Sequence, residues 1–270
     1  HPLLNLRVFR NRMLASGSAV LLVIFAVMTG IFLVLVQYLQ IVVGYSAIRA
    51  ATGLLPMAFV MMPLSAVAPL IARRVGTRAM FVAGSLAIAG GLAAMASMAS
   101  LSGGYWSVLP GLLLLAAGIG LVMTPGTTAI TASLPQEEQG VASALNDTVR
   151  EFGAASGVAL LGSIMAAGYT SSVRGATAGL PAEAAHAVQE GIGGAAVVAA
   201  KMGPAGAQLM QSARSAFLDG WTSSMWVSAG LVLGVAVLAA VWTPGPSREA
   251  EVVDAAEAAP LPEPVPVAGA

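Results

Sequence analysis

Apolar residues occur in six long stretches that are separated by shorter polar or glycine-rich segments. A helix needs about 20 mostly apolar residues to cross a bilayer core about 30 Å thick. A further apolar stretch, residues 192–200, is too short to cross. The predicted transmembrane helices are residues 13–39, 50–71, 79–99, 106–132, 141–168 and 222–242. The pattern predicts an all-α membrane protein, a bundle of six transmembrane helices.

The segments between these helices predict how the chain is organised. In chain order we expect a cytoplasmic linker at 1–12, five transmembrane helices at 13–168, an outer loop at 169–221, the sixth transmembrane helix at 222–242 and a disordered cytoplasmic tail at 243–270. The outer loop is predicted to be partly helical, over 181–190 and 206–218. The tail is rich in Pro, Ala and Glu, a composition that does not form a packed core. Because the chain starts at His1 without a signal-peptide pattern, we interpret it as the later part of a longer protein.

The composition agrees with a membrane protein and excludes several chemistries. Hydrophobic residues make up 57% of the chain and charged residues 9%, whereas a soluble domain has about 25% charged residues. The absence of cysteine removes disulfides and thiol catalysis, and two histidines make a histidine metal site improbable. The net charge of zero gives no reason to expect nucleic acid as a partner. We expect no enzyme activity, no metal and no cofactor.

Arginine in the short loops predicts the orientation of the bundle. Loops on the cytoplasmic side carry an excess of Lys and Arg. A cytoplasmic N-terminus leaves only Arg49 in a short outer loop. It places inside the arginines Arg7, Arg10, Arg12, Arg73, Arg74, Arg78 and Arg248. With six spans, both ends of the chain are then cytoplasmic, in a multi-pass protein of the cell membrane.

The fifth predicted transmembrane helix carries a polar cluster in its first half. Asn146 and Arg150 share a helix face, Asp147 is close enough to pair with Arg150, and Asp147 and Glu151 repel each other if both are ionised. Glu151 lies about 15 Å inside the helix start, near mid-membrane depth. A charge there costs at least about 2.5 kcal/mol, so these side chains are expected to face the bundle interior or a cavity.

Two acids beside one arginine leave one carboxyl group without a local partner. Burial and a nearby like charge both favour its protonated form. The hypothesis is a proton-coupling or gating cluster of Asn146, Asp147, Arg150 and Glu151. A structural network in which Arg150 pairs with the acids is the alternative, and it is compatible with gating. A soluble amphipathic helix is a third interpretation, against which the apolar run at 153–167 argues.

Other residues are candidates for packing, hinges or a substrate pathway. Glycine lets helix backbones approach and proline kinks a helix, although packing alone explains any single glycine. The candidate hinge or packing residues are Pro56, Pro63, Gly118, Gly120, Pro125, Gly153 and Gly157. Gln37 and Tyr38 near the outer face and the flexible Met123 are candidates for a substrate pathway, with an interfacial tyrosine and core filling as the ordinary alternatives.

Four segments together resemble a known family. They are residues 5–12 ahead of the first span, Tyr38-Leu39-Gln40 with the later Gly44, Gly53 and Pro56, Gly118-Ile119-Gly120, and the stretch 140–159 with its Arg150-Glu151-Phe152-Gly153. Residues 1–245 resemble the C-terminal half of a major facilitator superfamily transporter of the 14-helix drug:proton antiporter type (the EmrB/QacA-like group). The loop at 72–78 has Arg73 where the family's best-known loop signature has an acid, as in a weaker copy of that signature in the second half.

The resemblance implies what the chain does and what it works with. The six spans correspond to helices 9–14, and a missing N-terminal transmembrane half completes the fold. The implied function is proton-coupled efflux of a small amphipathic molecule, with the lipid bilayer, protons and a small-molecule substrate as partners. Export of a metabolite, peptide or sugar, a fragment inactive alone, and a non-transporting scaffold or membrane enzyme are the alternatives.

Overall fold

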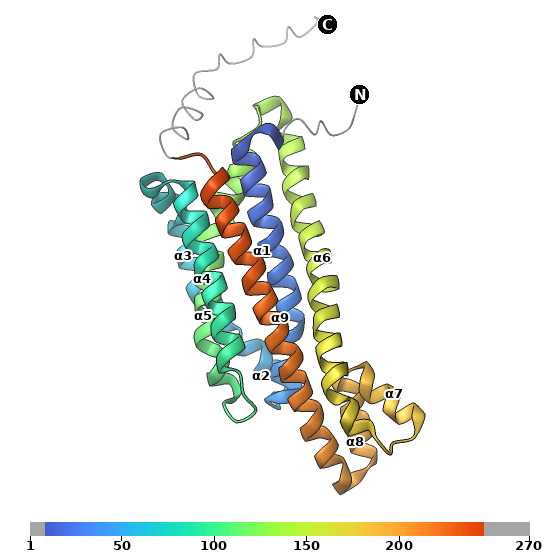
Figure 1. The fold of residues 1–270 in the computed structure, drawn as a ribbon. Coiled ribbons are helices and arrows are strands. Elements are labelled where there is room, and N and C mark those ends of the chain that lie inside the picture. Colours follow the sequence, from blue (N-terminus) through green and yellow to red (C-terminus); the bar gives the residue numbers. More distant parts are fainter. Residues whose placement is uncertain (1–8, 246–270) are drawn as a thin grey trace, which may run out of the picture.

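The computed structural model describes residues 9–245, which form a bundle of long helices with a small helical cap at one end (Figure 1). The predicted linker and tail therefore lie mostly outside the described residues. The α-helices are α1 (Arg12–Gln37), α2 (Ala47–Thr52), α3 (Leu55–Val75), α4 (Thr77–Met98), α5 (Gly104–Thr131), α6 (Gln139–Val173), α7 (Ala182–Glu190), α8 (Ile192–Lys201) and α9 (Gly206–Trp242). A π-helix, Tyr38–Val42, continues α1.

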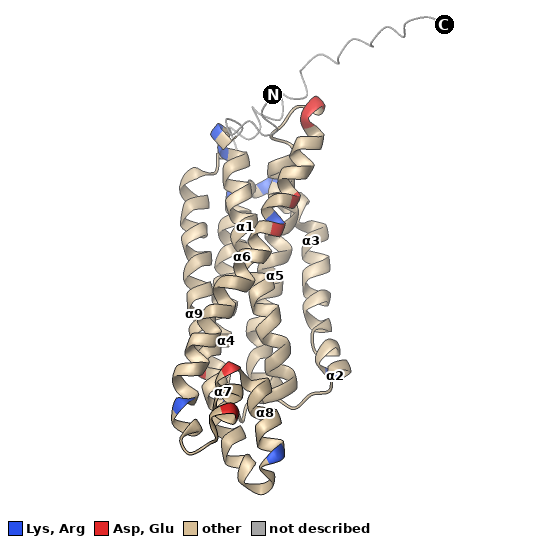
Figure 2. Ribbon diagram, turned by 90° about the vertical axis from the view of Figure 1, so that its right-hand side faces the viewer, with Lys and Arg blue, Asp and Glu red and all other residues tan. Residues whose placement is uncertain are grey.

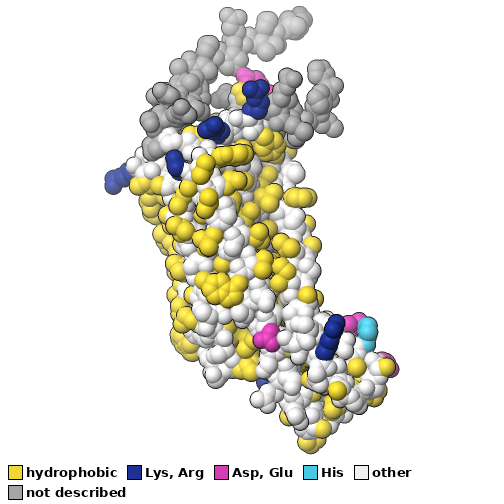
Figure 3. Space-filling model, viewed as in Figure 1, with side chains coloured by type: hydrophobic (Ala, Val, Ile, Leu, Met, Phe, Trp, Pro, Cys, Tyr) yellow, Lys and Arg dark blue, Asp and Glu magenta, His cyan; other side chains and the backbone are white. Residues whose placement is uncertain are grey.

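Six helical segments of the described chain are long and apolar enough to cross a membrane, which confirms the predicted six-helix bundle. They are Arg12–Val42, Ala47–Val75, Thr77–Met98, Gly104–Thr131, Gln136–Thr177 and Gly203–Trp242. Lys, Arg, Asp and Glu gather at the two ends of the bundle and are sparse between them (Figure 2). The long sides present mostly hydrophobic and other uncharged surface, as a lipid-embedded protein requires (Figure 3).

Local sequence explains where several helices begin and end. Asn11 caps α1, because its Oδ1 accepts a hydrogen bond from the backbone N–H of Met13 at 2.9 Å. Gly76 alone separates α3 from α4, and its φ of 85° lies in the left-handed region that favours glycine. Pro56 stands in the first turn of α3, where no backbone hydrogen bond is lost.

The transmembrane helices α1, α4, α5 and α9 pack around one another, because α4 contacts both α5 and α9, and α1 also touches both. Helix α3 packs on this set mainly through α5, and α6 packs on it through α1 and α9. The burial of the helices is uneven. The most apolar window is 56% buried in α4 but 11% buried in the span that contains α3 and 28% buried in the span that contains α6.

Two of the helices are much longer than a bilayer is thick. With 35 residues in α6 and 37 in α9, they extend about 52 and 55 Å, against a hydrocarbon core of about 30 Å. Helix α9 runs without a break from Gly206, so the helical stretch expected at 206–218 and the last transmembrane span are one helix. Its sequence holds no proline that would end it before Thr243.

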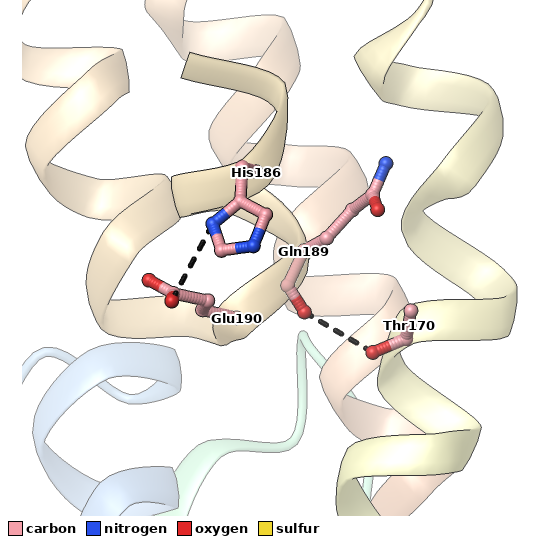
Figure 4. A network of polar contacts seen from close by, with 4 residues as sticks. All are labelled: Thr170, His186, Gln189 and Glu190. Carbon is pink, nitrogen blue, oxygen red and sulfur yellow. Dashed lines mark hydrogen bonds and ion pairs between the residues drawn. The ribbon is translucent and has the colours of Figure 1, made fainter. Parts of the chain in front are cut away.

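The cap consists of α7, α8 and the protruding ends of α6 and α9 (Figure 1). Side chains of α6 hold it in place. Tyr169 donates a hydrogen bond to the carbonyl oxygen of Val188 at 3.0 Å, and Thr170 donates one to the carbonyl of Gln189 at 3.1 Å (Figure 4). His186 and Glu190 form an exposed pair at 3.4 Å on the side of α7 away from these bonds.

Candidate functional site

The halves of α1, α5 and α6 that lie farther from the cap meet in a small apolar cluster. We call it the inner cluster. The partly buried Phe25 and Met123 pack against it. Its buried members are Leu14, Leu21, Ile130, Leu145 and Val149. The polar residues of α6 directly follow two members of this cluster in the sequence, Leu145 and Val149. The packing of the cluster therefore fixes the position of the candidate site.

Glycines of α6 allow an unusually close approach to α1. A Cβ atom added at Gly153 would lie 2.5 Å from the carbonyl oxygen of Leu22, and one added at Gly157 would overlap that of Ala26. Both contacts advance by four residues on each helix, as two helices packed in parallel ridges do. The glycine face of α6 therefore lies against the backbone of α1, and the opposite face is left open.

Two of the four polar residues lie on that open face. Asp147 and Glu151 are exposed, whereas Arg150 is half-buried with its guanidinium carbon 4.6 Å from the centroid of the Phe25 ring. The alternative interpretation, in which Arg150 pairs with the acids, finds no ion pair within 4.0 Å here: among residues 9–245 the only ion pair is His186–Glu190. Arg150 instead lies over an aromatic face on α1, which attracts a cation. The spacing along α6 could not reveal this partner on another helix.

Asn146 lies on the buried side of the same helical turn. Its side-chain Oδ1 has no hydrogen-bond partner, and its Nδ2 donates only a long bond of 3.4 Å to Asp147. The hydroxyl of Ser18 on α1 is also buried without a partner. Extending the four-residue register between α1 and α6 places Ser18 near the level of Val149. A buried polar group without a partner costs about 1–3 kcal/mol, so these atoms point to a role beyond packing.

The arrangement joins a buried, unsatisfied amide to an exposed pair of acids within one transmembrane helix. Glu151 lies twelve residues after the start of α6 at Gln139, which is about 18 Å along the helix. A carboxylate that lies within a hydrocarbon core requires water or a partner. Among residues 9–245 no group of acids and histidines is arranged to hold a metal ion.

The candidate pathway residues are not grouped together. Gln37 is exposed and borders a cleft of about 190 Å³ beneath the cap, together with Glu190 and Ile192. Tyr38 is fully buried and packs against Trp221, with ring centroids 5.0 Å apart and the rings tilted by 31°. Its hydroxyl lies within hydrogen-bond distance of the carbonyl oxygens of Ser100 and Gly104, at 3.4 and 3.2 Å, so its surroundings are those of a packing residue. Met123 packs against the inner cluster, in the other half of the bundle.

The candidate glycines and prolines have different surroundings. A side chain at Gly118 would meet the backbone of α4, and one at Gly120 would meet Met61 on α3, so this triplet packs α5 against two neighbours at once. Pro125 is buried inside α5, whereas Pro63 is exposed inside α3.

Comparisons with known proteins agree with this architecture. The family model described as Major Facilitator Superfamily matches residues 1–158. The multidrug efflux pump LfrA of Mycolicibacterium smegmatis is 33% identical over 242 residues, which are 89% of this chain and 47% of the relative. The methyl viologen resistance protein SmvA of Salmonella typhimurium is 26% identical over 248 residues, 89% of this chain and 48% of the relative.

A shorter match is with the tetracenomycin C resistance and export protein of Streptomyces glaucescens, 33% identical over 170 residues, which cover 61% of this chain and 30% of the relative. The chain spans about half the length of the first of these curated relatives. The bundle of six membrane-spanning helices and the family match over more than half of the residues lead to one conclusion: this chain belongs to the Major Facilitator Superfamily.

Proposed function

We propose that the chain is the C-terminal half of a proton-coupled exporter of small amphipathic molecules, of the 14-helix drug:proton antiporter type. The observation that carries the proposal is the open face of α6, where Asp147 and Glu151 are exposed inside a transmembrane helix beside the unsatisfied Asn146. Charged groups at this depth mark ion or substrate pathways in membrane proteins. The names of the relatives, a multidrug efflux pump and two resistance proteins, support efflux as the direction of transport.

The uneven burial of the bundle supports a missing half. The spans that contain α3 and α6 bury 11% and 28% of their apolar windows, less than the other spans. An N-terminal half that covered these helices would bury their exposed apolar surface and enclose the acids of α6. Transporters of this kind bind their substrate between two such repeats near the bilayer midplane.

The proposed roles within the site follow from burial. Asp147 and Glu151 are accessible and exchange protons, and Asn146 offers a free acceptor to water or solute. Arg150 is held over Phe25 on α1, so its charge moves with the α1–α6 pair. We propose that protonation of the acids alters their interaction with Arg150 and with the opposite half, and so couples proton entry to a change of access.

The orientation belongs to the same proposal. We place the ends of the chain in the cytoplasm and the cap outside, in a multi-pass protein of the cell membrane. The exposed arginines Arg73, Arg74 and Arg78 around the α3–α4 turn lie at the end of the bundle away from the cap, as the positive-inside rule requires.

The experiment is transport by the full-length polypeptide in proteoliposomes with an imposed pH gradient, using the cationic dye ethidium as the probe. The double variant Asp147→Asn with Glu151→Gln is expected to lose gradient-driven dye movement at least about tenfold, because it can no longer bind and release protons. The matched control is Glu137→Gln with Glu138→Gln, which removes two exposed acids just before α6 and leaves the transport rate unchanged.

The outcomes separate the parts of the proposal. Coupled transport that survives in the double variant refutes the proton role of these acids. Transport by residues 1–270 alone, at the rate of the full-length protein, refutes the need for an N-terminal half. Absence of any pH-dependent movement of ethidium or a panel of amphipathic cations and anions in the full-length protein refutes the assignment as a proton-coupled exporter.

A further inference from the structure

A second cleft also lies at the cap end of the bundle, between the π-helix that continues α1 and the cap. Its volume is about 560 Å³, and it is open on one side. Its walls are formed by the π-helix, by the end of α8 and by the first turns of α9. The residues that the argument uses are Gln40, Ile41, Ala199, Ala207, Met210 and Arg214.

Arg214 is the unusual member of this wall. Its Nε atom is buried and has no hydrogen-bond partner, and its guanidinium group forms no ion pair with any of the described residues. Arginine keeps its charge at all accessible pH values and its planar group binds phosphate or carboxylate through two parallel hydrogen bonds. The buried Nε–H without an acceptor is unfavourable, and a bound oxyanion would satisfy it.

Another wall of the cleft also points to a functional site. It is a π-helix, a rare distortion that is often found at functional sites.

The remaining wall is apolar and small. Ile41, Ala199 and Met210 supply hydrocarbon surface, and the exposed Gln40 is the one uncharged polar side chain at the mouth. An inorganic anion would leave this surface without a partner. A ligand with an apolar chain next to its charged group satisfies both parts of the wall.

The level of the cleft relative to the membrane determines which ligands can reach it. Arg214 lies 28 residues before the end of α9 at Trp242, which is about 42 Å along the helix. A hydrocarbon core about 30 Å thick ends well before that point, so the guanidinium lies at the level of lipid head groups or of water.

We propose that this cleft is a binding site for amphipathic oxyanions, in which Arg214 holds a phosphate or carboxylate group and the alanine-rich wall holds a short apolar chain. The ligand is either an anionic lipid or a soluble amphipathic anion, since both present the same chemistry. The site is independent of the acids of α6 and lies at the opposite end of the bundle.

The test measures thermal unfolding of the full-length protein in phosphatidylcholine nanodiscs with three probes of equal chain length: decyl phosphate, decanol and decyltrimethylammonium. A ligand that binds the folded state raises Tm in a saturable manner. We expect decyl phosphate alone to raise Tm. An equal rise with decanol would overturn the proposal, because it would show binding of the chain without the anion.

Variants assign the effect to the cleft. Arg214→Gln is expected to weaken decyl phosphate binding at least about tenfold, and Arg214→Lys to weaken it less. Ala207→Trp fills the cleft without removing the arginine and is also expected to abolish binding. The matched control Arg174→Gln removes an exposed arginine at the end of α6, outside the cleft, and leaves binding unchanged. Unchanged binding in both Arg214→Gln and Ala207→Trp refutes the site.

Nanodiscs with added phosphatidylglycerol identify the source of the ligand. A rise in Tm that requires Arg214, together with competition against decyl phosphate, identifies an anionic lipid as the natural ligand. Binding of decyl phosphate that phosphatidylglycerol does not affect identifies a soluble anion.

Discussion

Two asparagines show how differently one side chain is used in this protein. Asn11 caps the first turn of α1, and its Oδ1 accepts a bond of 2.9 Å from Met13. Asn146 is buried in the bundle, and its Oδ1 accepts nothing. The first stabilises the fold, whereas the second is a cost that the fold carries. Such a cost is typical of functional sites, where stability is given up for activity.

Replacement of these two residues is therefore expected to have opposite effects on stability. Asn146→Leu removes an unsatisfied polar group at similar volume and is expected to raise the free energy of unfolding by about 1 kcal/mol, while transport falls. Asn11→Ala is expected to lower it by about 1 kcal/mol with little effect on transport. Tm of the purified protein and dye transport in proteoliposomes measure both. A loss of stability in Asn146→Leu would show that the amide is bonded in the native protein.

At this scale the sequence predicts which residues carry charge inside the membrane but not their partners. The spacing of Asp147, Arg150 and Glu151 correctly places them on neighbouring turns of one helix. The partner of Arg150 is Phe25, more than one hundred residues away in the chain, and the free acceptor on Ser18 has no signature at all. Both depend on which helix packs on which, and hydropathy does not contain that information.

At the scale of helices, glycine determines which pairs come close. Gly157 of α6 faces the backbone of α1, whereas Gly162, five residues later on the same helix, would have no atom within 4 Å of an added Cβ. Close approach of this kind is how small residues hold membrane helices together, because lipid offers no hydrophobic drive for their association. Only some of the glycines in the spans therefore allow close helix packing.

These two glycines form a matched pair for a test of α1–α6 packing. Gly157→Ala places a methyl group against the carbonyl of Ala26 and is expected to lower stability by about 1–3 kcal/mol. Gly162→Ala meets open space and is expected to be neutral or stabilising by up to about 1 kcal/mol, because alanine favours the helix. Thermal unfolding in detergent distinguishes them, and equal values of Tm would contradict the close contact of α1 with α6.

Helix ends were less predictable than helix positions. The six spans follow from hydrophobic runs, but the continuation of α9 from Gly206 through Trp242 does not, because residues 206–220 are mixed in polarity and read equally well as a separate loop helix. Packing against α8 and the end of α6 extends this helix beyond the membrane. The cleft beneath Arg214 exists only because of that extension.

Over residues 9–245 the molecule is a helix bundle with most charged residues at its two ends and one polar cluster on the exposed side of α6 (Figure 2). The family could be predicted from local motifs such as Arg150-Glu151-Phe152-Gly153, and the match over residues 1–158 bears this out. The low burial of α3 and α6 could not be predicted, since it depends on how the helices pack. It raises the question of whether the face that carries Asp147 and Glu151 meets lipid or water.

Thiol labelling answers that question most directly, because this chain has no cysteine of its own. In the full-length protein, free of other cysteines and held in membranes, Thr148→Cys places a thiol on the exposed side of α6, beside Glu151. Glu137→Cys before α6 is the water-exposed reference, and Val237→Cys, 64% exposed on the apolar side of α9, is the lipid-facing reference. Only a thiol in contact with water ionises and reacts.

The measurement is the rate of reaction of each thiol with a charged, water-soluble thiosulfonate added from the cytoplasmic side. If the charged face of α6 lines a water-filled transport path, Thr148→Cys reacts at a rate close to that of Glu137→Cys, and a transported dye slows the reaction. If Thr148→Cys is as unreactive as Val237→Cys, the face is buried in lipid or protein, and the proposed path along α6 is contradicted.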